Sequence, residues 1–123
     1  MNEVIKKEFT HLKIHTQYSI CEGALRTLDL AKYCKINKVK AVGLCDSNNL
    51  CGALEFSETI AKSKTQPIIG TQINIQYKGH SGKIPLFAKD LEGYKNLIKL
   101  SSKSFLEIKN DEDPHCKIED IKK

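Results

Sequence analysis

Two stretches of the chain have side chains that could activate water or hold a metal ion. The first contains Lys13 and His15, followed by Glu22 in a small, polar, glycine-containing loop. The second ends in Asp46 and Ser47. Imidazole and carboxylate groups act as general acids and bases and also as metal ligands. Because residues two apart in a strand point to the same side, Lys13 and His15 are predicted to share one face.

Two further features near these residues leave alternatives open. The segment from Asp46 to Asn49 is interpreted either as a phosphate-binding loop before a helix or, preferably, as an Asx-type turn with a helix cap. A catalytic thiol at Cys45 is the less favoured interpretation, because nothing in the sequence indicates a lowered pKa or a base partner. The five cysteines are odd in number, contain no C-x-x-C pair and match no zinc spacing. Reduced thiols in a cytoplasmic protein are therefore predicted.

Composition narrows the class of protein. The chain has 123 residues, of which 40% are hydrophobic and 28% charged, and no apolar run long enough to cross a membrane. Residues 1–8 do not resemble a signal peptide, so we expect a cytoplasmic protein with no membrane partner. The net charge of +5 comes from lysines scattered among acids and a single arginine, Arg26. The sequence therefore predicts no basic stripe and no stacked-aromatic platform, and gives only weak support for DNA contact.

The elements that must position these residues follow a β-α-β-α-β-β-α pattern. Thr27 is expected to cap the first helix, and Asp90 is expected to cap the last long one. Two successive β-α-β steps predict an α/β fold with a mostly parallel sheet and one β-hairpin, the opening half of a barrel. The expected strands are 9–15, 40–46, 67–77 and 84–88, and the expected helices are 27–37, 50–63, 90–105 and, as a short last turn, 116–122.

Four segments resemble the polymerase-and-histidinol-phosphatase (PHP) domain, in the version found at the N-terminus of bacterial DNA polymerase III α subunits. They are 9–19, 41–56, 67–72 and 89–102, the last being the most diagnostic. The resemblance covers about 9–107, which makes 1–123 a partial PHP domain with a polar segment at 108–123. It implies the N-terminal half of a distorted seven-stranded β/α barrel. The rest of that domain and the polymerase domains are expected to lie outside this sequence.

The resemblance also implies positions for a trinuclear metal site at the carboxyl ends of the strands. Where metal-dependent members have H-x-H, this chain has Lys13-Ile14-His15, and Glu22 occupies the place of the acid that follows. Where they have T-D-H, it has Cys45-Asp46-Ser47, and the glutamate that ends I-I-G-x-E is Gln72. The protonated amine of Lys13 offers no lone pair to a metal ion, and the neutral amide of Gln72 offers no negative charge. Neither side chain can therefore replace the family's ligand.

We therefore expect six relic positions with no metal and no catalytic residue: Lys13, His15, Glu22, Asp46, Ser47 and Gln72. An ion pair of Lys13 with Glu22 or Asp46 is predicted to replace the metals. By resemblance, the segment is expected to be a docking domain without a cofactor, within a polymerase that uses Mg²⁺. Its expected partners are the proofreading exonuclease subunit and the rest of the polymerase, with DNA bound through the whole enzyme. The alternatives are a metal-dependent phosphoesterase or proofreading nuclease, and a free-standing short protein.

Overall fold

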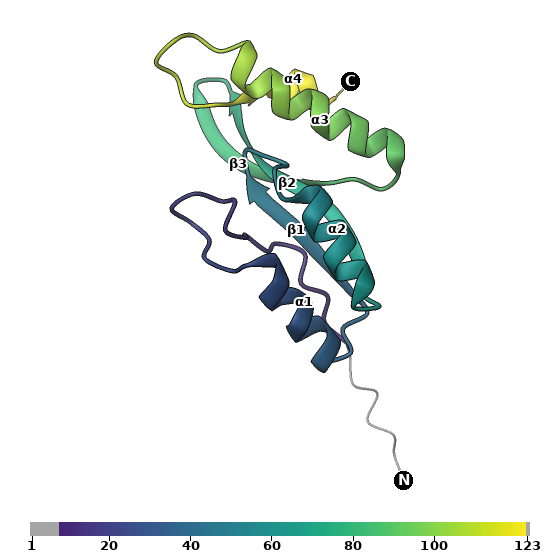
Figure 1. Cartoon of the computed structure of the whole chain (residues 1–123). Coiled ribbons are helices and arrows are strands. Elements are labelled where there is room, and N and C mark those ends of the chain that lie inside the picture. Colours follow the sequence, from purple (N-terminus) through teal and green to yellow (C-terminus); the bar gives the residue numbers. More distant parts are fainter. Residues whose placement is uncertain (1–7, 123) are drawn as a thin grey trace.

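The structure is a computed structural model that describes residues 8–122. Helices and strands alternate along the chain until the hairpin (Figure 1). In order, they are α1 (Thr27–Ile36), β1 (Ala41–Ser47), α2 (Ala53–Lys62), β2 (Gln66–Tyr77), β3 (His80–Phe87), α3 (Leu91–Leu106), β4 (Cys116–Lys117) and α4 (Ile118–Ile121). No helix among the described residues is long and apolar enough to cross a membrane.

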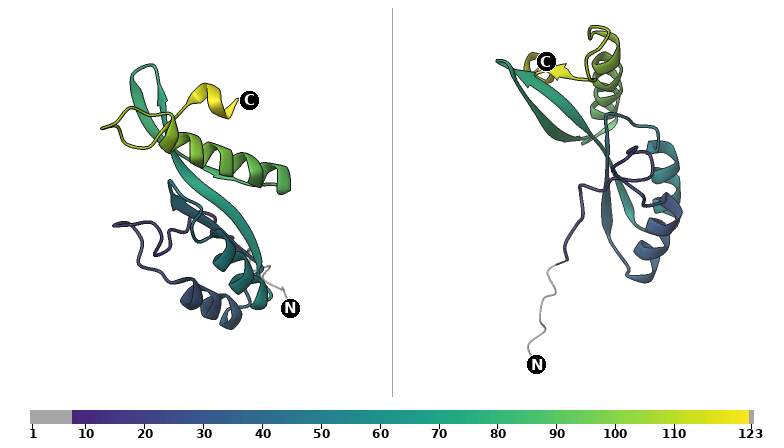
Figure 2. Two further views of the ribbon diagram at one scale, coloured as in Figure 1. Left: turned by 45° about the horizontal axis from the view of Figure 1, so that its top comes forward. Right: turned by 90° about the vertical axis from the view of Figure 1, so that its left-hand side faces the viewer.

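The sheet is mixed, and the expectation of a mostly parallel sheet is wrong. β1 runs parallel to the first part of β2, whereas β3 is antiparallel to its second part. The short β4 pairs in parallel with β2 at Ile75 and Gln76, beyond the end of β1. The antiparallel return is forced by a two-residue turn in which Lys78 and Gly79 both have positive φ, 47° and 78°. The predicted hairpin is confirmed, but a barrel is not: the described strands form an open sheet (Figure 2).

The expected first strand, 9–15, is an extended segment and not a strand. It lies beside β1 through one bridge, in which the Ile14 amide donates to the Gly43 carbonyl at 3.3 Å and the Cys45 amide donates to the Ile14 carbonyl at 2.8 Å. A Cβ on Gly43 would lie 2.7 Å from the Leu12 carbonyl oxygen. Only glycine permits this close approach of the two backbones, and the segment stays too irregular for a ladder.

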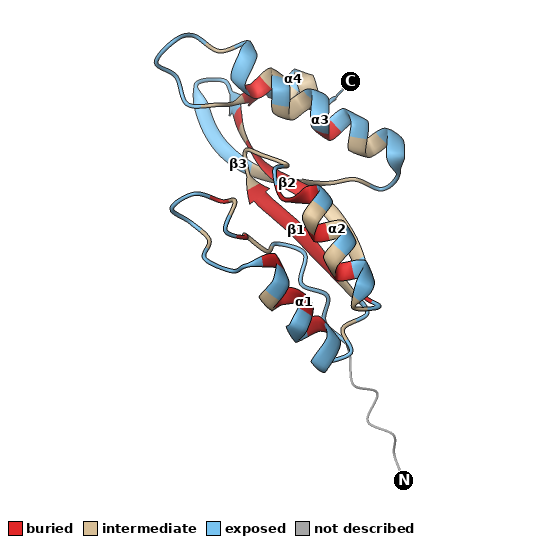
Figure 3. Ribbon diagram, in the orientation of Figure 1, coloured by how far each residue is buried: buried red, intermediate tan, exposed pale blue. Residues whose placement is uncertain are grey.

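Two apolar clusters hold the elements together. The first packs α1 and α2 against β1, with Phe56, Leu44 and Ile60 fully buried (Figure 3). The second joins the far end of β2 to α3, β4 and α4, around Ile73, Ile75 and Cys116.

Several apolar side chains of the three long helices lie outside the core and are exposed: Leu28, Tyr33, Leu54, Ala61, Ile98 and Phe105. Helical spacing finds the general stripe of a helix but not its edges, because each helix here covers only one face of a narrow sheet.

The two predicted helix caps had different outcomes. The Asp90 carboxylate accepts a hydrogen bond from the Gly93 amide at 2.8 Å, which confirms it as the cap of α3. Thr27 is not the cap of α1: Arg26 occupies that position without a side-chain hydrogen bond, and the buried Thr27 hydroxyl has no partner among the described residues. Thr27 is instead the first residue of α1 and is fully buried.

Candidate functional site

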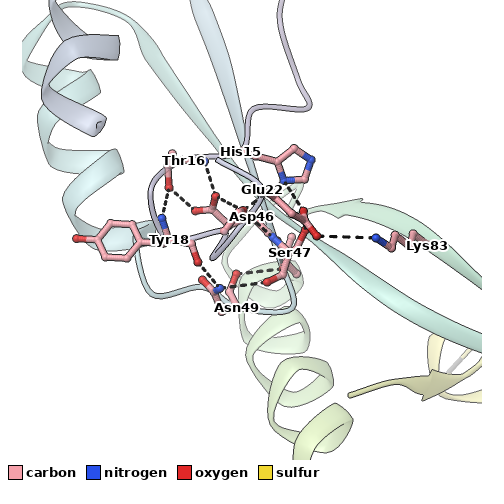
Figure 4. Close-up of polar contacts among 10 residues, drawn as sticks. His15, Thr16, Tyr18, Glu22, Asp46, Ser47, Asn49 and Lys83 are labelled. Atoms are coloured by element: carbon pink, nitrogen blue, oxygen red, sulfur yellow. Dashed lines mark hydrogen bonds and ion pairs between the residues drawn. The ribbon is translucent and has the colours of Figure 1, made fainter. Parts of the chain in front are cut away.

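The candidate residues meet at the carboxyl end of β1, under the loop that joins residue 16 to α1 (Figure 4). This loop closes on itself, since Thr16 pairs with Leu25 and the Gln17 amide donates to the Leu25 carbonyl at 2.9 Å. The last two residues of β1, Asp46 and Ser47, reach into the loop from below. The expected convergence of two chain segments at one strand end is thus present in the structure.

Asp46 is the centre of the site. Its carboxylate is fully buried and accepts three hydrogen bonds: from the Thr16 amide at 2.6 Å, the Thr16 hydroxyl at 2.7 Å and the Ser19 hydroxyl at 2.7 Å. A buried carboxylate is tolerated only when such donors replace its water shell. The Thr71 hydroxyl, on β2, donates to the Asp46 backbone carbonyl at 2.8 Å. One acidic residue therefore joins the loop, β1 and β2.

Ser19 links this centre to His15. The Ser19 hydroxyl group donates its hydrogen bond to the Asp46 carboxylate. Its oxygen accepts a hydrogen bond from the Ser47 amide at 3.1 Å and lies 3.3 Å from His15 Nδ1. Because the only hydroxyl hydrogen of Ser19 is used on Asp46, the His15 Nδ1 must carry the proton in that contact. Residues 15 and 19 are therefore held as donor and acceptor in a structural network.

Glu22 forms a second, half-exposed cluster beside the first. Its carboxylate accepts a hydrogen bond from the Ser47 hydroxyl at 2.5 Å, and it lies 3.8 Å from Lys83 Nζ and 3.8 Å from His15 Nδ1. The Ser47 hydrogen bond, helped by the charges of Lys83, His15 and Lys13, holds the pKa of Glu22 below its ordinary value. Lys83 comes from β3, so this pair ties the hairpin to the loop.

The predicted ion pair of Lys13 is wrong. Lys13 is exposed and makes no ion pair within 4.0 Å among residues 8–122; Lys83 takes the place beside Glu22. Lys13 acts on that carboxylate only through its more distant charge.

Gln72 lies at the same end of the sheet. It is opposite Ser47 in the register of β1 and β2 and is only 5% exposed. Its backbone carbonyl accepts from the Asn48 amide at 2.8 Å. Five of the six sequence-predicted positions therefore gather at this strand end, and Lys13 remains outside.

The loop after β1 is an Asx-type turn, as preferred from the sequence. The Asn49 side-chain oxygen accepts from the Cys51 amide at 3.1 Å, and its nitrogen donates to the Tyr18 carbonyl at 2.9 Å. Its residues do not cap α2, because Gly52 occupies the cap position. A Cβ on Gly52 would lie 2.6 Å from the Tyr18 ring, so the absence of a side chain at this position leaves room for that ring.

Cys45 has no features of a nucleophile. It is fully buried, and this burial raises the pKa of its thiol to about 11. The thiol therefore stays protonated near neutral pH, and thiolate chemistry is not available to it.

The side chains present do not fit a cluster of metal ions. No group of three or more His, Cys, Asp or Glu side chains in the described part of the chain is arranged to bind one. The Asp46 oxygens already face three donors, and a hydroxyl and an ammonium group occupy the Glu22 oxygens. A cation would have to displace all of these donors and face the positive charge of Lys83.

Sequence reasoning missed three residues of this site: Thr16, Ser19 and Lys83. The first two carry only a weak signal, since a Ser or Thr hydroxyl in a loop is a potential donor whose partner the sequence does not identify. Lys83 carries none, because it lies in a hairpin strand 61 positions from the carboxylate that it approaches. Its role depends on how the hairpin folds back.

Comparison with known proteins identifies relatives of this arrangement. A family model described as PHP domain matches residues 11–123. Proteins named DNA polymerase III subunit alpha are 44% identical over 87% of the chain in Rickettsia prowazekii and 40% identical over 82% of it in Helicobacter pylori. The chain spans 9% of the length of each of these relatives.

A solved structure shares the fold. It is a crystal structure of a putative metal-dependent phosphoesterase from Bifidobacterium adolescentis, with a TM-score of 0.58 and 17% identity. The match covers 77% of this chain and 32% of the other. At this identity the likeness concerns the fold alone.

We predict that Asp46→Asn strongly destabilises the chain. The amide would place an NH₂ group against donors and lose charge-assisted hydrogen bonds, so the free energy of unfolding should fall by about 3 kcal/mol. Urea unfolding followed by circular dichroism measures this. The control is Asp29→Asn, which removes a charge from an exposed ion pair with Arg26 and should have a clearly smaller effect. Equal losses in the two variants would contradict the central role of Asp46.

We also predict that Ser47→Ala raises the pKa of Glu22, because the largest cause of its lowering is removed. A lowered folded-state pKa gives stability above the ordinary value of 4.5 that is lost as the pH falls through the folded value. Acid sensitivity from this group should therefore diminish in the variant. An NMR titration of the Glu22 carboxyl carbon measures the shift, with Ser57→Ala on α2 as the control. An unchanged titration in Ser47→Ala would show that the hydrogen bond does not form in solution.

Proposed function

The chain belongs to the PHP domain family, and from this we propose that it is the N-terminal segment of a DNA polymerase III α subunit that works as a metal-free structural and docking domain. Identities of 40–44% to proteins of that name over most of the chain support the assignment. In this proposal the mixed sheet is the N-terminal half of a distorted β/α barrel. The remaining strands belong to the longer protein, of which the chain spans about a tenth.

The occupied carboxylates of Asp46 and Glu22 are the observation that carries the proposal. In a metal-dependent relative, anionic side chains of this kind face cations. Here Thr16, Ser19 and Ser47 supply hydrogen bonds to them, and Lys83 supplies a positive charge. These contacts supply the charge compensation that a metal cluster would otherwise give, and they leave a strand end suited to support and not to hydrolysis.

The activity belongs to the larger protein in this proposal. That protein carries out DNA-templated DNA synthesis with Mg²⁺ in the cytoplasm, on catalytic residues outside this chain. The proposed partners of the segment are the rest of the polymerase and the proofreading exonuclease subunit, with DNA bound through the whole enzyme. The five free cysteines of the chain agree with a reducing compartment.

A metal-dependent phosphoesterase is the second candidate. It is favoured by the shared fold with the Bifidobacterium adolescentis protein, whose title describes a putative metal-dependent phosphoesterase. The substitution of ligand positions by Lys13, Ser47 and Gln72 argues against it, as does the use of Asp46 in three hydrogen bonds.

Metal content separates the two candidates. We expect elemental analysis of the purified chain to find much less than one Zn, Mn or Fe per chain, and no hydrolysis of p-nitrophenyl phosphate. The triple variant Lys13→His, Ser47→His, Gln72→Glu restores imidazole and carboxylate ligands and should gain metal. The matched triple variant Lys13→Gln, Ser47→Ala, Gln72→Asn should gain none. Two or three tightly held ions in the natural chain would favour the phosphoesterase.

Docking is tested separately from metal content. We expect the full chain to co-elute in gel filtration with the exonuclease subunit from the same organism, and excess full-length α subunit to displace it by competing for the same surface. The Asp46→Asn variant, which loses the loop-to-strand links, should bind more weakly. If the natural chain does not bind the exonuclease subunit under conditions in which the α subunit does, the docking role lies outside this segment.

A further inference from the structure

Lysines that are scattered in the sequence gather at one end of the structure, far from the Asp46 site. They lie where α1 and α2 end and β1 begins, at the lower end of the sheet in Figure 1. Together they line one hollow of about 590 Å³: Lys35, Lys38, Lys40, Lys62 and Lys64, with Val39 and Ser63. The sequence, which shows no basic stripe, does not reveal this gathering of lysines.

The local structure explains this gathering. Lys35 and Lys62 lie in the last turns of α1 and α2, where a positive charge interacts favourably with the helix dipole. Lys38 and Lys64 follow the two helices in left-handed conformation, with φ of 50° and 60°. Parallel packing of both helices on β1 brings their ends together.

Only one acid of the described residues pairs with these lysines. Glu8 lies 2.9 Å from Lys40 Nζ, and the other four lysines make no ion pair within 4.0 Å among residues 8–122. Four ammonium groups around a single hollow repel each other, and helix dipoles offset this only in part. A polyanion is the ligand chemistry that fits such a surface.

Exposed rings line a second hollow next to the first. This hollow of about 390 Å³ contains Phe9, His11 and Tyr33, and it shares residues 38–40 with the lysine hollow. Phe9 is 76% exposed and Tyr33 is 54% exposed, although large apolar rings usually bury themselves. Phe9 and His11 form a T-shaped pair with ring centroids 4.7 Å apart, and the Phe9 ring remains largely exposed.

From this juxtaposition, we propose that the lysine hollow and the ring hollow together bind single-stranded nucleic acid without sequence preference. The ammonium groups would contact successive phosphates, and Tyr33 and Phe9 would stack on unpaired bases. A duplex offers phosphates but no open base faces, and an acidic peptide offers no repeating rings. The absence of arginine in both hollows removes the bidentate groups that read base edges. The inference rests on this surface and is independent of the proposed docking role.

Fluorescence anisotropy of the full chain with a labelled oligo-deoxythymidylate tests the lysine hollow. Lys35→Gln, Lys62→Gln and Lys64→Gln together should weaken binding at least about tenfold and lower the salt slope by about 2, since each phosphate contact adds about 0.7. The control variant Lys89→Gln, Lys95→Gln, Lys99→Gln removes equal charge from exposed positions in and beside α3 and should change affinity by less than about twofold.

Substitutions in the ring hollow should change oligonucleotide affinity without changing its salt dependence. Tyr33→Ala should weaken oligonucleotide binding at least about fivefold at an unchanged salt slope, because stacking releases no counterions, and Tyr33→Phe should retain affinity. The inference is overturned if the oligonucleotide does not bind, if the α3 control loses as much as the hollow variant, or if duplex DNA binds equally well and Tyr33→Ala has no effect. Binding to phosphatidylserine vesicles or polyglutamate in preference to the oligonucleotide would also overturn it.

Discussion

A buried carboxylate that must be hydrogen-bonded is the constraint on which this structure depends. Asp46 is the last residue but one of β1 and has no exposure to solvent, so donors from the neighbouring loop replace its lost water. Thr16 and Ser19 provide them, so the loop has one allowed position over the end of β1. The same contacts fix His15 through Ser19 and bring Glu22 to Ser47. One unsatisfied acid would thus disturb every element at this end of the sheet.

The same network shows how carboxylates that meet at one strand end are stabilised by the chain's own side chains. Carboxylates crowded at one place need positive charge or donors, whichever the chain supplies. Here two hydroxyl groups and a backbone amide serve the buried acid, whereas the half-exposed one has the Ser47 hydroxyl together with Lys83 and His15 nearby. Neutral donors suit the interior because they bring no charge of their own, while the ammonium group keeps contact with water. The division follows burial and not sequence position.

The two ends of the sheet differ in chemistry because parallel β-α units point all their helices the same way. At one end, β1 finishes beneath a loop rich in hydroxyl groups. At the other, α1 and α2 both finish, and the lysines that suit helix C-termini are brought together. A preference that acts on each helix separately becomes a charged surface once the helices pack side by side.

The sequence by itself determined the helices, the hairpin and the Asp90 cap, because these depend on residue types a few positions apart. Only the tertiary structure decided that 9–15 is not a strand, that Lys83 and not Lys13 approaches Glu22, and that five separate lysines share one hollow. The physical reason is the separation along the sequence of the residues that interact. Hydrogen bonds and charge pairs between distant residues depend on the path of the whole chain, and the local sequence pattern does not specify that path.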